Sequence, residues 1–341
     1  MRKGKFKNLS ILIILSVGLA VNNAQAISFT NLVIVGDSLT DTGNVTDLSV
    51  ATIGIPAPLP PYAMGRISNG QIWVDELASR LGLGPVIASA NGGTNYAWGG
   101  ARTGPATVPP DTPSLPLSLL DQANEYLTDV GGVADPGALY VVFGGGNDIR
   151  DLADDPGSGG TTVAQSARNI STTVTELNNA GATNFLVVNL PNVGLSPEAQ
   201  DDGTAAVAES LSIEFNELLA SNIADTSSML PVDITSVDFF AILNMLISDA
   251  SFGFTNSTDA CWTGDFFGNG TQCVNPDEYI FWDDLHLTSA ASTVLGEFAY
   301  QAVIPLPATL PLFAACLALL GFLSRRRGRV RGGHRATQSG K

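Results

Sequence analysis

Three short segments of the sequence carry side chains that could together perform acyl transfer. Ser38 lies in residues 36–44 directly after an apolar run, Asn147 follows three consecutive glycines, and Asp283 precedes His286 by three residues. Acyl transfer needs a hydroxyl nucleophile, an imidazole base, a carboxylate that orients the base, and neutral donors for an oxyanion. These residues supply that set, and they predict ester chemistry through a covalent acyl-enzyme.

His286 is the one histidine that could act as this base. The chain has two histidines, and His334 lies in a basic C-terminal tail. On a turn that leads into a helix, the Asp283 carboxylate can accept a hydrogen bond from Nδ1 of His286 and leave Nε2 facing outward. A lone histidine at a helix cap is the alternative. Two histidines also make a His-rich zinc site unavailable, and we expect no metal.

Each of the other segments has a simpler structural interpretation as well. Residues 36–44 could be an ordinary turn and helix N-cap, where Ser and Asp are favoured. Residues 144–146 could be a plain glycine turn, although three glycines also let a ligand approach the backbone. Residues 95–101 hold another glycine pair beside polar and aromatic side chains. The acidic residues 148–155 could bind Ca²⁺, but a solvated surface is the favoured interpretation.

Charge and missing motifs argue against several function classes. Between residues 27 and 304 the chain has five arginines, no lysine and all 32 of its Asp and Glu residues. Such an acidic surface repels phosphate backbones, which argues against nucleic acid as a partner. The lack of lysine there excludes a P-loop or Schiff-base lysine. The absence of G-x-S-x-G and G-x-G-x-x-G disfavours an ordinary α/β-hydrolase and a dinucleotide-binding fold.

The elements that must position these residues fit an α/β fold. Apolar runs rich in β-branched residues predict strands at residues 31–35, 86–90, 139–143, 184–190 and 232–237. Helix-compatible segments alternate with them at residues 71–81, 118–128, 161–180, 197–223, 238–246 and 289–303. This alternation predicts a parallel sheet covered on both faces. Ligands of such sheets bind beyond the carboxyl ends of the strands, where Ser38 and Asn147 lie.

Both ends of the chain have the pattern of export signals. Residues 1–26 contain a basic region, an apolar run and the small-residue site Ala24-Gln25-Ala26, which predicts a signal peptide cut by signal peptidase. An uncleaved anchor helix is the alternative. Residues 305–341 contain Pro305-Leu306-Pro307, an apolar stretch and an arginine cluster. That stretch can just span a bilayer with the arginines cytoplasmic, and a buried core helix is the alternative.

The C-terminal tail resembles the PEP-CTERM sorting signal of bacteria, with Pro305-Leu306-Pro307 where that family usually has Pro-Glu-Pro. The resemblance implies an exosortase-type sorting protease as a partner and a Gram-negative source. It also implies tethering in the inner membrane by the C-terminal helix, followed by export to the cell surface or matrix. Cys316 falls in the tail, which leaves Cys261 and Cys273 as a pair. In an oxidising compartment we expect them to form a disulfide that stabilises the fold by about 2 to 4 kcal/mol.

Four blocks in order resemble the signature blocks of the GDSL (SGNH) esterases and lipases: residues 36–39, 95–101, 144–148 and 283–286. Residues 65–73 are similar to a further segment that is common in secreted members. The resemblance covers roughly residues 29 to 300 and makes 27–304 the predicted hydrolase domain. It implies a three-layer α/β/α, flavodoxin-like fold with a mostly parallel five-stranded sheet.

Carried over residue by residue, the resemblance implies Ser38 as the nucleophile, His286 as general base and then acid, and Asp283 as the carboxylate that orients it. The implied oxyanion hole consists of the Ser38 N–H, the Gly100 N–H and the Asn147 side chain. Gly100 is preferred to its neighbour because counting from residue 95 puts it at the family's position. The resemblance implies no cofactor.

The substrate stays open at this point. A lipid or short-chain acyl ester is one possibility, in keeping with the similarity to secreted lipolytic members. An acetyl ester of an exopolysaccharide is a second, motivated by the matrix-type sorting tail. A non-catalytic extracellular matrix protein that keeps the fold is a third.

Overall fold

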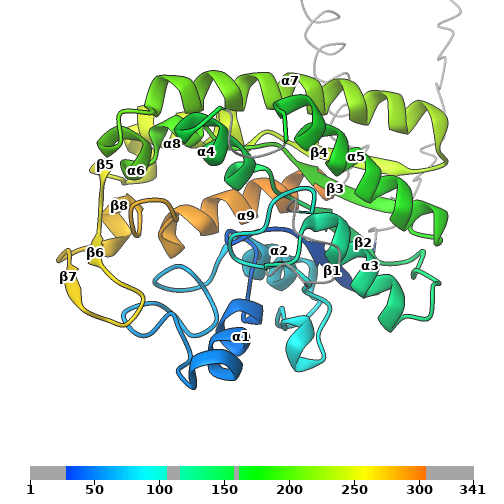
Figure 1. Cartoon of the computed structure of the whole chain (residues 1–341), viewed down its shortest axis with the longest axis horizontal. Coiled ribbons are helices and arrows are strands. Elements are labelled where there is room, and N and C mark those ends of the chain that lie inside the picture. Colours follow the sequence, from blue (N-terminus) through cyan, green and yellow to red (C-terminus); the bar gives the residue numbers. More distant parts are fainter. Residues whose placement is uncertain (1–27, 106–115, 157–160, 305–341) are drawn as a thin grey trace, which may run out of the picture. The chain divides into compact units, whose positions relative to one another are not determined.

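Four parallel strands form the sheet at the centre of the protein (Figure 1). The computed structural model describes residues 28–105, 116–156 and 161–304. The strands lie side by side in the order β1 (Leu32–Val35), β2 (Leu139–Val142), β3 (Asn184–Val188) and β4 (Asp233–Val237). β1 and β2 are buried along their whole length because apolar side chains project from both faces of these strands, as in sheets that helices cover on both sides.

The predicted fifth strand at residues 86–90 is wrong. The chain there leads into a short 3₁₀ helix, Ser89–Asn91, and Gly92 follows with a φ of +78°. This left-handed glycine turns the chain back, so that the next residues, and not 86–90, reach the outer edge of β1. Ile34 of β1 forms a single parallel bridge with Asn95 there. The described part of the central sheet therefore has four strands and an irregular edge segment.

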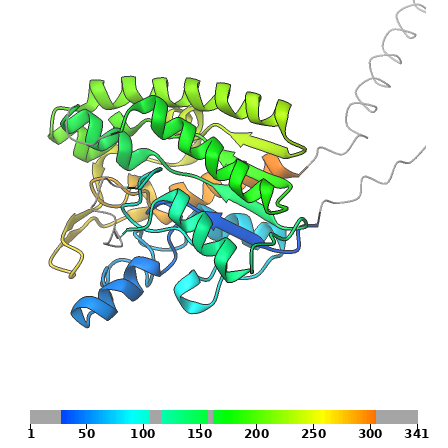
Figure 2. The same ribbon diagram turned by 45° about the vertical axis from the view of Figure 1, so that its right-hand side comes forward.

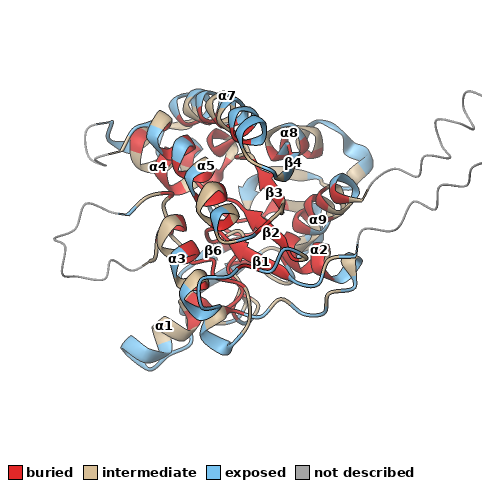
Figure 3. Ribbon diagram, turned by 90° about the vertical axis from the view of Figure 1, so that its right-hand side faces the viewer, coloured by how far each residue is buried: buried red, intermediate tan, exposed pale blue. Residues whose placement is uncertain are grey.

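Helices cover both faces of this sheet, and Figure 3 shows the buried residues concentrated between the two helix layers. One layer contains α3 (Leu119–Asp129), α5 (Val163–Asn179) and α7 (Ala205–Met229). The other contains α2 (Trp73–Leu81), α8 (Phe239–Ser248) and α9 (Ser289–Val303). Figure 2 shows α5 and α7 lying side by side over their face. The α/β/α architecture expected from the sequence is confirmed.

Two features of the helices differ from the prediction. The helix expected at residues 197–223 is divided into α6 (Pro197–Asp201) and α7, because Gly203 between them has a φ of +73°. In addition, α1 (Asn44–Ile53) and α4 (Gly146–Asp154) follow the segments that contain Ser38 and Asn147. Both helices begin with residues of low helix propensity, which is why local preference alone did not predict them.

A smaller β-structure lies outside the central sheet. β5 (Asn256–Ala260) pairs with β8 (Tyr279–Phe281), and β6 (Trp262–Gly264) forms a hairpin with β7 (Gly270–Gln272). The disulfide between Cys261 and Cys273 closes the base of this hairpin, which confirms the predicted pairing. Further 3₁₀ helices lie at Val193–Leu195, Ala250–Phe252 and Pro276–Glu278.

The predicted export signals lie outside the described residues. Ser28–Ile304 forms one compact unit, and the signal peptide at 1–26 and the sorting tail at 305–341 remain predictions. Within the described ranges, no helix combines the length and the apolar character needed to cross a membrane.

Candidate active site

Ser38 lies in a tight turn directly after the carboxyl end of β1. The Asp37 carbonyl oxygen accepts a hydrogen bond from the backbone N–H of Thr40 at 3.0 Å, which closes the turn. Gly36 comes directly before this turn. A Cβ at its position would lie 2.2 Å from Oγ1 of Thr40 and 2.8 Å from the carbonyl oxygen of Phe143. The close approach of two segments therefore requires glycine here, and it places Ser38 just beyond the edge of the sheet.

His286 connects Ser38 with Asp283. Its Nε2 lies 2.9 Å from Oγ of Ser38, and its Nδ1 lies 2.9 Å from each carboxylate oxygen of Asp283. The same carboxylate accepts hydrogen bonds from the backbone N–H groups of Leu285 at 2.9 Å and His286 at 2.6 Å. The structure thus brings the Asp283–His286 pair into contact with a hydroxyl 248 residues away in the sequence.

The electrostatics of the Asp283–His286 pair favour an ionised Asp283 carboxylate and a basic His286 imidazole. Burial alone would raise the pKa of Asp283, but the charge of His286 and the hydrogen bonds to the carboxylate together lower this pKa to about 2. Burial acts to lower the pKa of His286, and the neighbouring Asp283 carboxylate outweighs it, so that the pKa lies above its ordinary value of 6.5. His286 is therefore a stronger proton acceptor than a free imidazole.

Hydrogen-bond donors from two other segments border the same cavity as Ser38. The backbone N–H of Gly99 donates to the Asp41 carboxylate at 3.0 Å, whereas that of Gly100 has no acceptor among the described residues. The Asn147 side chain uses one hydrogen of Nδ2 to donate to the carbonyl oxygen of residue 101 at 2.8 Å. A second hydrogen of this amide remains. Gly100 and Asn147 therefore offer donors to a bound ligand.

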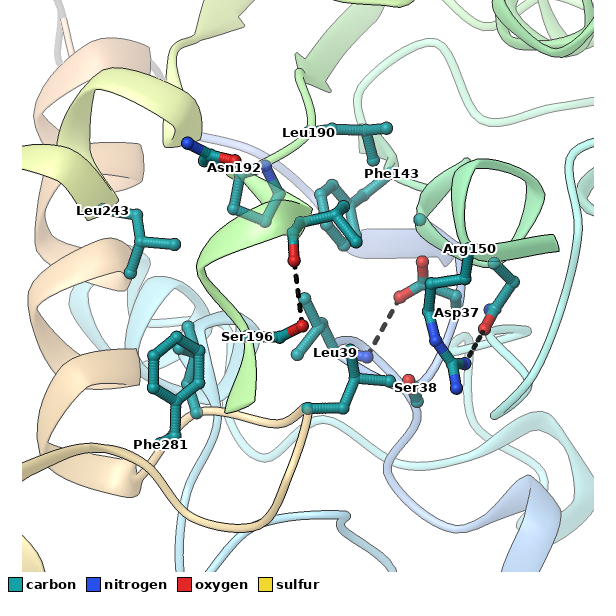
Figure 4. Close-up of a pocket in the computed structure, with 16 residues that line it drawn as sticks. Asp37, Ser38, Leu39, Phe143, Arg150, Leu190, Asn192, Ser196, Leu243 and Phe281 are labelled. Carbon is teal, nitrogen blue, oxygen red and sulfur yellow. Dashed lines mark hydrogen bonds between the residues drawn. The ribbon is translucent and has the colours of Figure 1, made fainter. Parts of the chain in front are cut away.

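Two cavities of different character flank Ser38. The first is the smaller of the two, measures about 50 Å³ and has a mainly apolar lining that includes Leu39, Phe143, Leu190, Leu243 and Phe281. Figure 4 shows Ser38 at one end of this cavity and Leu243 and Phe281 toward the other.

The second cavity is open to solvent. It measures about 600 Å³ and contains the donors described above, with His286 in its wall. Phe266 and Phe267, from the tip of the β6–β7 hairpin, border it and are 44% and 48% exposed. Neither cavity nor any other described part of the chain holds three His, Cys, Asp or Glu side chains arranged for a metal ion.

Residues 32–298 match the family model of the GDSL-like lipases and acylhydrolases. The chain belongs to this family. It is 30% identical to a GDSL esterase/lipase of Arabidopsis thaliana over 79% of this chain and 86% of the relative. It is 26% identical to an uncharacterized Pseudomonas putida protein encoded in the trpE–trpG intergenic region, over 84% of this chain and 51% of that protein. The chain therefore spans about half the length of that relative.

Among solved structures, a carbohydrate acetylesterase from Sinorhizobium meliloti is similar to this GDSL-family chain. The two are 17% identical with a TM-score of 0.42, over 80% of this chain and 95% of that structure.

Several polar residues that hold the GDSL-family site together are not evident from the sequence. The hydroxyl of Tyr62 donates to Oδ2 of Asp283 at 3.0 Å from 221 residues away, and no local pattern predicts this contact. The side chain of Asp41 accepts hydrogen bonds from the backbone of Gly43, Asn44, Val45 and Gly99, and so connects the segment that follows Ser38 with the second signature block. Asp41 lies two residues after the first block, and this position was the available signal.

Residues 65–73, which are similar to a segment of secreted GDSL proteins, form hydrogen bonds with the loop that carries His286. The hydroxyl of Ser68 donates to the carbonyl oxygen of Leu287 at 2.8 Å. The side-chain oxygen of Asn69 accepts a hydrogen bond from the backbone N–H of Ser289 at 2.7 Å. These contacts on both sides of the turn after His286 restrict the movement of the imidazole relative to Ser38.

Proposed function

We propose that the protein hydrolyses carboxylic esters through an acyl-enzyme on Ser38. Oγ of Ser38 attacks the ester carbonyl carbon while Nε2 of His286 takes the hydroxyl proton. The imidazolium, paired with Asp283, then gives this proton to the oxygen of the leaving alcohol. A water molecule attacks the acyl-enzyme, His286 accepts a proton from it, and the carboxylic acid leaves as Ser38 regains its proton. The observation that carries the proposal is the hydrogen-bonded row of Ser38, His286 and Asp283 at 2.9 Å per contact.

The negative charge that develops on the carbonyl oxygen needs fixed donors. We assign this role to the backbone N–H groups of Ser38 and Gly100 and to the Asn147 amide. Neither N–H group has an acceptor among the described residues, and Asn147 has an amide hydrogen to spare. Donors held in place before the reaction stabilise such an oxyanion without a reorganisation cost.

The two cavities favour a short acyl group on a larger alcohol. The smaller, apolar cavity suits the acyl chain, and its volume of about 50 Å³ favours a short chain. The open cavity of about 600 Å³ leaves room for the alcohol.

A panel of p-nitrophenyl esters tests both ester hydrolysis and this limit. We expect the full-length protein to hydrolyse the acetate and butyrate with a kcat/KM at least about 10-fold above that of the palmitate, because a long chain exceeds the smaller cavity. Leu243→Ala enlarges this cavity and should extend the preferred chain length. Leu246→Ala is the matched control, since Leu246 is equally buried in α8 but does not line the cavity. A preference for the palmitate would contradict the assignment of the acyl side.

An acylated carbohydrate is a second candidate substrate. A further groove of about 640 Å³ meets the open cavity at Gly264 and Asp284 and is lined by Gln200, Asp201, Thr258 and Asp259. Side chains of this kind can exchange hydrogen bonds with sugar hydroxyl groups. The groove and the short acyl limit together favour an acetylated sugar over a long-chain lipid.

We also propose that the protein is exported by its two terminal signals. The pattern of residues 1–26 and the Pro305-Leu306-Pro307 tail support this, as does the disulfide, which persists in oxidising compartments. In a Gram-negative host with an exosortase, we expect mass spectrometry of the secreted protein to give a new N-terminus near residue 27 and loss of the apolar tail. An intact chain recovered from the cytoplasm would contradict this proposal.

A further inference from the structure

Arg150 joins the Asn147 amide to a second helix. It lies one turn after Asn147 in α4, and its Nη1 donates to Oδ1 of Asn147 at 3.1 Å. Its Nε donates to Oε2 of Glu198 in α6 at 2.6 Å, and its Nη2 donates to the other oxygen of that carboxylate. Because a guanidinium presents its donors in a rigid planar fork, these three hydrogen bonds hold it in one orientation.

The contact with Arg150 determines which way the Asn147 amide faces. An amide has an acceptor on one side and donors on the other, whereas arginine only donates. Oδ1 of Asn147 must therefore face Arg150, and Nδ2 faces the carbonyl oxygen of Ala101, to which it donates at 2.8 Å. A flipped amide would set two oxygens against each other at Ala101 and would remove the hydrogen that is left for an oxyanion.

We infer that Arg150 is a positioning residue for ester hydrolysis and acts through Asn147. The inference rests on the proposed function, because it gives Asn147 a role only if an oxyanion forms beside Ser38. Figure 4 shows Arg150 and Ser38 at the same end of the smaller, apolar cavity.

Glu198 extends the same connection to the loop that carries His286. The backbone N–H of Glu198 donates to the carbonyl oxygen of Asp284 at 2.8 Å, and Asp284 follows Asp283 directly. The path from Asn147 through Arg150 and Glu198 therefore connects the oxyanion donor with the acid–base pair. We expect this connection to maintain the distance between the Asn147 amide and His286. Misplacement of a catalytic group by about 1 Å can cost on the order of 10²-fold in rate.

Arg150→Met tests the inference, since it keeps an unbranched stem and removes the donors. We expect kcat for p-nitrophenyl butyrate to fall by about 10- to 100-fold, the range for loss of a hydrogen bond to a charged group. KM should change by less than about 2-fold, because the oxyanion exists only in the transition state and the intermediate.

The same substitution in an Asn147→Ala background shows whether Arg150 acts through the amide. Asn147→Ala alone should lower kcat by on the order of 10²- to 10³-fold. If Arg150 only orients Asn147, adding Arg150→Met to this variant should cost less than about 3-fold more. Losses that multiply in the double variant, or a rise in KM in place of the fall in kcat, would overturn the inference.

Two further variants keep the test interpretable. Arg80→Met removes ion pairs to Glu76 and Glu297, and because Arg80 lines neither cavity, this control should retain the kcat of the wild type. If thermal melting shows that Arg150→Met does not fold, Arg150→Lys replaces it in the same double-variant comparison. An ammonium group lacks the fork, so a reduced kcat is expected, and an unchanged kcat would overturn the inference.

The outcomes also separate this inference from the proposed function. A folded wild-type protein with no ester hydrolysis would remove the proposed function itself. An active wild type whose kcat is insensitive to Arg150→Met would overturn the role of Arg150 alone.

Discussion

Replacing Ser38 with alanine is expected to lower kcat for p-nitrophenyl butyrate by on the order of 10⁵- to 10⁶-fold, as loss of the nucleophile does in serine hydrolases. The hydroxyl of Ser38 hydrogen bonds to Nε2 of His286, and alanine leaves that base without a group to activate. The backbone turn should persist, because it depends on the Asp37 carbonyl and on Gly36 rather than on the serine hydroxyl. The measurement is initial-rate kinetics on the full-length chain, with thermal melting to show that the variant is folded.

Ser292→Ala provides the matched control for this experiment. Ser292 is also buried, at 3% exposure, but it lies in α9 and lines neither cavity beside Ser38. This variant should keep the kcat of the wild type. A fluorophosphonate should label the wild type on Ser38 and leave Ser38→Ala unlabelled. Retained turnover in Ser38→Ala would exclude Ser38 as the nucleophile, and a folded wild type that is inactive and unlabelled would favour a non-catalytic matrix protein.

Asp283→Asn is expected to lower kcat by on the order of 10⁴-fold, the effect known for the orienting carboxylate of serine proteases. The carboxylate holds Nδ1 of His286 and stabilises the imidazolium that forms when Ser38 loses its proton. An asparagine amide can instead donate to Nδ1, which favours the tautomer whose Nε2 carries a proton and cannot accept one. Asp284→Asn is the control, because it removes a neighbouring charge that makes no hydrogen bond to His286 and should cause a far smaller loss.

The pH dependence of kcat/KM provides a second measurement on Asp283→Asn. Activity requires neutral His286, so it rises with pH through the pKa of this residue. Asp283 raises that pKa above 6.5, and its removal should therefore move the midpoint of the rise to lower pH.

Burial raises the pKa of Asp37 to about 7, so that group titrates in the same range. An Asp37→Asn variant separates the two, since the shift on Asp283→Asn should persist in that background. A midpoint that stays in place would contradict the role of Asp283.

The local features of the site were predictable from residue types and short spacings. Asp283 and His286 are three residues apart, so a single turn sets their geometry, and both carboxylate oxygens reach Nδ1 as that spacing predicts. Ser38 and Asn147 follow apolar strands, and the carboxyl ends of parallel neighbours meet at one edge of a sheet. The apolar character of β1 to β3 was likewise enough to predict a parallel sheet between helix layers. Each of these inferences depends on a periodicity or an interval of a few residues.

The contacts that complete the site were decided only by the tertiary structure. Tyr62 reaches Asp283 across 221 residues, and Arg150 reaches Glu198 across 48. The identity of the segment beside β1 was also decided by the tertiary structure. The apolar run at residues 86–90 has the composition of a strand, but the chain turns back at Gly92 and Asn95 pairs with the outer edge of β1 instead. Propensity and spacing describe what a segment can become on its own. Which distant segments meet depends on how all the layers pack around one core. The free energy of this packing is shared among residues that no local pattern connects.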